Sequence, residues 1–178
     1  MSYRPITDTW ILARPKVPYY GAYPNGFLER ARVLLGVDLS QPVLHVCGGM
    51  VKDYPGKRGI GFNDCTLDMD PLLFPDYLRD ARDPIPDPDK WAAVLGDPPY
   101  TPEDADHYAV GRSVLPSACE ILTSALKGVR PGVRVGILHY IWAAPRPRDL
   151  GNPLALITVI AGYDNRARLF SVWERPLR

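Results

Sequence analysis

The stretch WAAVLGDPPY, residues 91–100, joins a short apolar run to a polar and aromatic tip. Residues 91–95 have the length and composition of a buried strand. The tip consists of Asp97, Pro98, Pro99 and Tyr100. Asp97 accepts hydrogen bonds, Pro98 offers a backbone carbonyl without donating, and Tyr100 presents a flat ring for stacking. A strand with this tip is suited to hold a planar ring that carries an amino group. The alternative is a plain turn, because 20 of the 178 residues are proline.

A second apolar run, residues 43–47, follows Pro42 and stops at Gly48 and Gly49. Its length and its flanks predict a buried strand that ends at Cys47. Because glycine has no side chain, the two glycines would let the backbone approach a bound molecule closely. A glycine pair in a loop is also common for purely structural reasons, so the neighbouring motifs must indicate whether this pair binds a ligand.

A third strand is predicted at residues 65–69, with Asp68 near its end. Asp68 lies 20 residues beyond Gly48, and dinucleotide-binding folds place a carboxylate at this distance to hold a ribose diol. A carboxylate suits this task because it accepts from both hydroxyls at once. Asp64 and Asp70 are alternatives, and the alternation of apolar and polar residues favours Asp68.

Helices are predicted on both sides of these strands. One spans residues 27–35, with Asn25 as a cap before it and Gly36 as its stop. A longer helical pattern follows Pro102, and Pro116 is expected to divide it. The remaining expectations are an irregular arm at residues 1–25, one helical turn at 77–79, strands at 133–141, 154–162 and 167–174, and a tight turn at Asp164-Asn165. Together they predict an α/β fold, mostly parallel, with a terminal antiparallel hairpin.

Composition favours a single soluble domain over residues 1–178. The apolar share of 46% and the charged share of 23% are ordinary for a globular protein. A net charge of +1 gives no general attraction to nucleic acid, so such binding would need a local patch. The three cysteines lack a metal-binding spacing, which favours the cytoplasm and argues against a zinc site. No apolar run approaches the roughly 20 residues of a membrane span.

The order of these motifs resembles the amino-methyltransferases, which use S-adenosylmethionine to methylate the exocyclic nitrogen of adenine or, in relatives, of cytosine. The tetrapeptide at residues 97–100 is similar to their catalytic motif, and the likeness covers nearly the whole chain. It implies a Rossmann-like methyltransferase fold with S-adenosylmethionine as cofactor. It further implies that Asp97 and the Pro98 carbonyl accept the amino protons while Tyr100 stacks on the target ring.

The same resemblance implies a set of cofactor-binding residues. The glycine strand tip would cradle the methionine part, Asp68 the ribose, and an acidic loop the adenine, with an aromatic segment before the first helix. These residues are Tyr20, Gly21, Cys47, Gly48, Gly49, Asp68, Asp80 and Ala81. The chain departs from the family at residues 45–47, where His-Val-Cys replaces the usual acid or aromatic residue. It also lacks the usual lysine near Gly21, and the glycines and proline between Met50 and Cys65 make a poor helix.

For the substrate, the resemblance implies N6 of adenine, with DNA favoured over RNA. Trp142 would line the base pocket, and Arg146 and Arg148 would contact phosphates; the alternatives are a core aromatic residue and an ordinary exposed loop. The chain has no evident target-recognition region, which predicts a recognition subunit or a homodimer. Other readings are a catalytically idle subunit that binds cofactor or an active partner, or methylation of RNA or of a protein amide.

Overall fold

In the computed structural model, residues 4–15, 22–53, 58–102, 115–162 and 166–177 are described. Eight strands in these ranges form one sheet in the order β1-β7-β8-β6-β5-β2-β3-β4. The strands are β1 Ile6–Leu12, β2 Val43–Val46, β3 Cys65–Asp68, β4 Tyr77–Leu78, β5 Ala93–Gly96, β6 Arg134–His139, β7 Asn152–Ala161 and β8 Arg168–Glu174. The helices are α1 Phe27–Leu35 and α3 Ala118–Gly128, with 3-10 turns at Val51–Asp53, Pro71–Leu73 and Arg148–Leu150.

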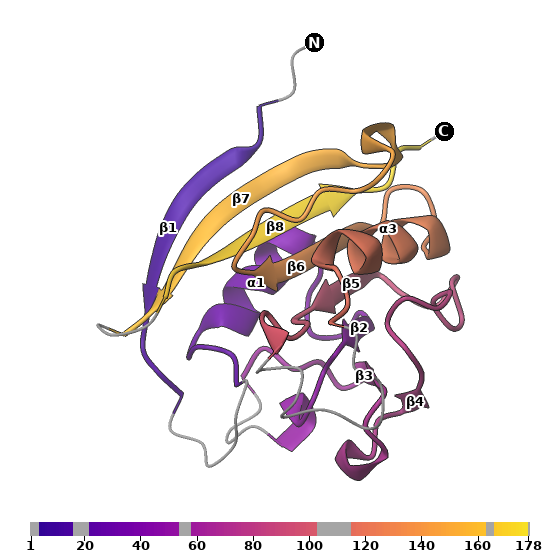
Figure 1. Ribbon diagram of the computed structural model, residues 1–178, viewed down its shortest axis with the longest axis horizontal. Helices are drawn as coiled ribbons and strands as arrows, with labels where there is room; N and C mark the ends of the chain where they lie inside the picture. The colour runs from indigo at the N-terminus through magenta and orange to yellow at the C-terminus, as the bar shows by residue number, and fades with distance from the viewer. Residues whose placement is uncertain (1–3, 16–21, 54–57, 103–114, 163–165, 178) are drawn as a thin grey trace.

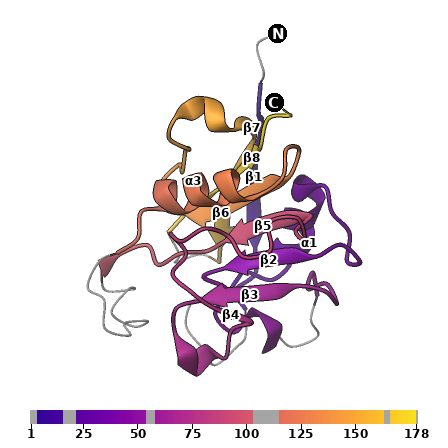
Figure 2. The ribbon, with the colours of Figure 1, turned by 90° about the vertical axis from the view of Figure 1, so that its right-hand side faces the viewer.

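All pairings in the sheet are parallel except those of β8, which runs antiparallel to both β6 and β7. Figure 2 shows β6, β5, β2, β3 and β4 one below another. The expected fold class, a mostly parallel α/β sheet with a terminal antiparallel hairpin, is confirmed. The expected tight turn at Asp164-Asn165 lies outside the described residues.

Helices α1 and α3 lie on opposite faces of the sheet (Figure 1). On β2, Val43 packs with α1, whereas Leu44 and Val46 pack with α3, as the alternation of side chains along a strand requires. Phe27 of α1 anchors its side of the core, with its ring centroid 5.1 Å from that of Phe170. As predicted, α1 ends at Gly36, which adopts a left-handed φ of 72°.

The expectation of an irregular arm at residues 1–25 is wrong for Ile6–Leu12, which forms strand β1 beside β7. Burial alternates in the second half of the segment, since Trp10 and Leu12 are buried and Ile11 is exposed. This period of two is typical of a half-buried strand. Its pairing partner lies about 150 residues away in the sequence, so local features alone predicted an arm.

Two further local expectations are corrected. The helical turn expected at residues 77–79 is instead the short strand β4, which pairs with β3. Asn25 does not cap α1, because Gly26 occupies the cap position and the Asn25 side chain donates to the carbonyl of Arg14. α3 begins two residues after Pro116, so Pro116 lies outside the helix that follows it. The part of the long helical pattern within 103–114 lies outside the described residues.

A buried ion pair joins α1 to the sheet. The Arg32 guanidinium donates to both oxygens of Asp64, at 2.6 and 2.5 Å. Asp64 also accepts from the His45 ring and from the backbone N–H groups of Val43 and Gly61. Burial alone would raise the pKa of Asp64, but the hydrogen bonds from His45 and Arg32 outweigh it and hold the pKa below its usual value.

We expect Asp64→Asn to lower the free energy of unfolding at pH 7 by about 3–5 kcal/mol, because it leaves the buried Arg32 charge uncompensated. A group with a lowered folded pKa contributes stability above its unfolded pKa and loses it as the pH falls through the folded value. The gap between the variant and the unchanged chain should therefore shrink in acid. Urea unfolding from pH 7 to pH 3 measures both effects.

The matched control is Asp70→Asn. Asp70 accepts from the Leu72 N–H as the cap of a short 3-10 turn, and asparagine caps about as well as aspartate. We expect that control to change stability by less than about 1 kcal/mol. An equal loss in the two variants would contradict the structural role assigned to Asp64.

Candidate functional site

The carboxyl ends of β2, β3 and β5 meet at one edge of the sheet (Figure 2). The chain leaves β2 through Cys47, whose φ of 53° is left-handed, and then through Gly48 and Gly49. A side chain on Gly48 would lie 2.8 Å from the carbonyl oxygen of His45, which is too close. Above Gly49, by contrast, an added Cβ would meet nothing within 4 Å. This turn therefore requires glycine at one position and borders open space at the next.

Of the three acids considered for the ribose, Asp68 is the one beside the glycine turn. Its Oδ2 accepts from the N–H of Gly49 at 3.1 Å, and its Oδ1 accepts from the N–H of Asp70 at 3.1 Å. Burial raises the pKa of Asp68, although the backbone donors act against this rise. Asp64 is engaged in the ion pair with Arg32, and Asp70 caps the 3-10 turn.

The loop after β4 brings a third segment to this edge. Asp80 forms an ion pair with Arg82 at 2.5 Å and accepts from its backbone N–H, while Ala81 packs against the α3 side of the core. The acids of these segments affect the pKa of the Cys47 thiol. Burial raises the pKa of the Cys47 thiol well above its usual value, and the charges of Asp68, Asp97 and Asp80 raise it further. The charges of Asp68, Asp80 and Asp97, from three different segments, thus all act on the Cys47 thiol.

The tetrapeptide begins at the end of β5, next to the tip of β2. The N–H of Asp97 donates to the carbonyl of Val46 at 3.2 Å. The hydrogen bonding between β5 and β2 thus extends one residue past the end of β5. The Tyr100 hydroxyl donates to Asp97 Oδ1. The Tyr100 side chain therefore points toward Asp97, the acid of the same tetrapeptide.

A cluster of aromatic and basic side chains surrounds Tyr100. Its ring centroid lies 4.5 Å from that of Tyr140 and 5.1 Å from that of His139, both at the end of β6. From β8, Arg168 Nη1 donates to the Tyr100 hydroxyl oxygen at 3.2 Å. Burial raises the pKa of Tyr100 well above its usual value; the Asp97 charge adds to this rise, and Arg168 opposes it.

Arg168 did not emerge from the sequence. It reaches the tetrapeptide because β8 runs antiparallel to β6, so that Leu169 pairs with His139. Arg168 could have been found by pairing the last predicted strand, residues 167–174, with the end of the strand predicted at residues 133–141. His139, the last residue of β6, is itself held by a local contact, since its Nδ1 accepts from the N–H of Ile141.

The structure does not bring Trp142, Arg146 and Arg148 to this cluster. The Trp142 ring stacks on Trp173, at 6.2 Å between centroids, and Trp173 pairs with Val135 near the start of β6. The Arg146 N–H donates to Thr123 in the middle of α3. The reason is topological: β7 runs parallel to β6, so the connecting loop must return along α3 to the opposite edge of the sheet. Tyr20 and Gly21 lie outside the described residues.

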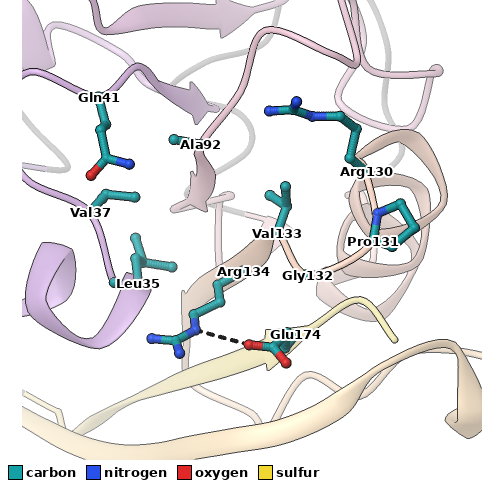
Figure 3. Close-up of a pocket in the computed structure, with 11 residues that line it drawn as sticks. Leu35, Val37, Gln41, Ala92, Arg130, Pro131, Gly132, Val133, Arg134 and Glu174 are labelled. Carbon is teal, nitrogen blue, oxygen red and sulfur yellow. Dashed lines mark hydrogen bonds and ion pairs between the residues drawn. The ribbon is translucent and has the colours of Figure 1, made fainter. Parts of the chain in front are cut away.

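A surface hollow of about 450 Å³ lies at the opposite, amino-terminal edge of the parallel strands (Figure 3). Ala92 and Gln41 border it just before β5 and β2, and the ion pair of Arg134 with Glu174 lies on its floor. It contains none of the residues predicted for the site. We therefore place the candidate site at the carboxyl edge, where the acids and the aromatic cluster gather.

Among the described residues, no helix is long and apolar enough to cross a membrane. No protein-family profile and no curated protein sequence matches the chain. Solved structures do match. TrmN from Thermus thermophilus has a TM-score of 0.60 and 16% identity over 88% of this chain, which spans 50% of the length of TrmN. N-methyltransferase NodS from Bradyrhizobium japonicum WM9 has a TM-score of 0.51 and 12% identity, with 85% of this chain and 98% of NodS covered.

An rRNA methylase from Streptococcus thermophilus has a TM-score of 0.50 and 13% identity, with 87% of this chain and 99% of the methylase covered. The chain has the Rossmann-like fold of class I methyltransferases. In open α/β sheets, ligands bind at the carboxyl edge where the strand order reverses. In this methyltransferase fold the reversal lies between β2 and β5, because β3 and β4 follow β2 on one side and β5 returns on the other. Cys47 and Asp97 flank that point.

We expect Cys47 to react with iodoacetamide more slowly than Cys119 at pH 8, because its raised pKa leaves less of the reactive thiolate. Asp68→Asn removes one of the charges responsible and should speed the alkylation of Cys47 by about twofold to tenfold, since a tenfold change corresponds to one pKa unit. Peptide mass spectrometry measures both rates in one sample. Cys119, on α3, serves as the internal control, and an unchanged Cys47 rate in the variant would contradict the convergence of these groups.

Proposed function

We propose that this protein transfers a methyl group from S-adenosylmethionine to the exocyclic amino nitrogen of a nucleobase, with N6 of adenine in DNA as the expected target. The observation that carries the proposal is the placement of Asp97 beside Cys47 at the reversal point of a methyltransferase fold. A turn with no function would have no reason to set an acid, two prolines and an aromatic residue at that point.

The described residues fit the cofactor. Open space lies above Gly49, and its N–H is bonded to Asp68, so the turn and the acid form one cradle. Each Asp68 oxygen already accepts one backbone N–H, and a carboxylate oxygen can accept a second donor, such as a ribose hydroxyl. Solved neighbours support the assignment, since NodS has been determined in complex with S-adenosyl-L-homocysteine.

When bound, S-adenosylmethionine supplies a methyl group that its sulfonium already activates. The task left to the chain is to hold an amino nitrogen in line and to make its lone pair available. That lone pair is delocalised into the ring of the base. Asp97 and the Pro98 carbonyl would accept the two amino protons, which favours a tetrahedral nitrogen and stabilises the transition state more than the ground state. The proton can leave after the transfer, so no general base is required.

The basic and aromatic groups beside the tetrapeptide support a nucleic acid as the substrate. The Arg166 guanidinium lies 5.8 Å from the centre of the Tyr140 ring, and Tyr140 lies against Tyr100. Stacking on aromatic rings next to arginine is how proteins hold unstacked bases and the adjoining phosphates. Because a target amine must leave a duplex to reach such a site, a single-stranded or flipped base is the expected form.

We expect the purified chain to bind S-adenosylmethionine in calorimetry and to transfer labelled methyl to single-stranded DNA. Asp97→Ala should lower the transfer rate by about 10²- to 10³-fold, because the developing charge on nitrogen loses its acceptor. Its affinity for the cofactor should stay within about twofold, since Asp97 is expected to contact the amine. Asp68→Ala should instead weaken cofactor binding by about tenfold or more.

The matched control is Asp149→Ala, an exposed acid of the 3-10 turn before β7, which should change neither quantity. Duplex DNA, RNA and a glutamine peptide form parallel arms that identify the substrate class. Cofactor binding without transfer to any arm would favour an idle subunit. No heat at millimolar S-adenosylmethionine, or full activity in Asp97→Ala, would refute the proposal.

A further inference from the structure

We infer that Arg168 is a positioning residue of the candidate site, which acts through the Tyr100 hydroxyl to fix the orientation of the Asp97 carboxylate. This inference rests on the proposed function. The contacts form a chain of three groups from two distant segments: Arg168 on β8 donates to Tyr100, and Tyr100 donates to Asp97. None of the sequence motifs includes Arg168.

The geometry makes the chain directional. Arginine has only donors, so its N–H occupies a lone pair of the phenol oxygen and leaves the phenol hydrogen to point toward Asp97. Hydrogen bonds arranged head to tail in this way polarise one another. The guanidinium carbon also lies 5.5 Å from the centre of the Tyr100 ring, so Arg168 contacts both the hydroxyl and the ring.

The electrostatics agree with this arrangement. Burial acts to lower the pKa of Arg168, but the negative character of Tyr100 and Asp97 outweighs it and raises the pKa. Arg168 is half-buried, and Tyr140 also contributes to the field around it. An arginine in this position remains charged across the accessible pH range, so the chain of donors stays intact.

The consequence for the reaction lies in the rotation of the Asp97 carboxylate. A bond from Tyr100 to Oδ1 removes the freedom of that group to turn about its Cβ–Cγ bond. An incoming amine would then meet an acceptor of fixed direction, which keeps its nitrogen near the attack geometry. Loss of Arg168 should leave the acid in place but allow it to turn, so the turnover rate should suffer while cofactor binding does not.

The test is a double-mutant cycle with Arg168→Met and Tyr100→Phe in the full chain. We expect Arg168→Met to lower kcat for methyl transfer to single-stranded DNA by about 10- to 100-fold, with affinity for S-adenosylmethionine unchanged within about twofold. Arg168→Lys, which keeps a charged donor, should recover part of kcat. In the Tyr100→Phe background, Arg168→Met should change kcat by less than about twofold, because the hydroxyl through which it acts is absent.

A second readout does not depend on activity. The carbon that bears the Tyr100 hydroxyl can be observed by NMR in chain labelled with ¹³C-tyrosine, and the signal lost in Tyr100→Phe identifies it among the 10 tyrosines. This resonance should shift in Arg168→Met and in Asp97→Ala. It should stay in place in Arg166→Met, the matched control from the same hairpin, whose guanidinium lies over Tyr140 instead.

Two results would overturn the inference: an unmoved Tyr100 resonance in Arg168→Met, or an equal loss of kcat with and without the Tyr100 hydroxyl. The second would indicate a direct contact of Arg168 with the substrate. If the unchanged chain transfers no methyl group, the proposed function fails and with it the catalytic purpose of Arg168. The resonance then still decides whether the three groups are coupled.

Discussion

The buried carboxylate of Asp64 is the constraint on which the candidate site depends. It accepts from Arg32 of α1, from the His45 ring on β2, and from the backbone N–H groups of Val43 on β2 and Gly61 in the loop before β3. Such a charge is costly to bury unless every lone pair finds a donor, so α1, β2 and the loop that contains Gly61 have one shared arrangement. His45 lies two residues before Cys47. The contact of its ring with Asp64 therefore holds the strand from which the glycine turn leaves the sheet.

Charge is distributed unevenly around the turn. The charges of Asp68, Asp80 and Asp97 act on the Cys47 thiol, whereas Arg168 of the last strand contacts Tyr100. A neutral thiol at the centre tolerates this field because its raised pKa keeps it protonated. The positive side chains instead lie beside the aromatic rings, where a base and its phosphates would be expected.

The sequence predicted the buried strands β2, β3 and β5 well, because a short apolar run ending in glycine or acid has few other interpretations. It favoured Asp68 over Asp64 and Asp70 by alternation alone, because the ion pair that engages Asp64 joins it to Arg32, 32 residues away. It missed β1 and Arg168 for a related reason: both are placed by pairing between strands distant in sequence. The loop with Arg146 was misplaced because only the direction of β7 reveals which edge it returns to.

The orientation of Tyr100 links the aromatic cluster at the end of β6 to the acid at the end of β5. A ring expected to stack on a base instead packs on Tyr140, and its hydroxyl engages the acid expected to receive the amine. The carboxylate can still accept further donors, since its two oxygens offer about four lone-pair sites. Under the proposed function, an incoming amine would meet only the lone pairs that Tyr100 leaves open, so the bond that Tyr100 keeps would set the direction from which the amine approaches.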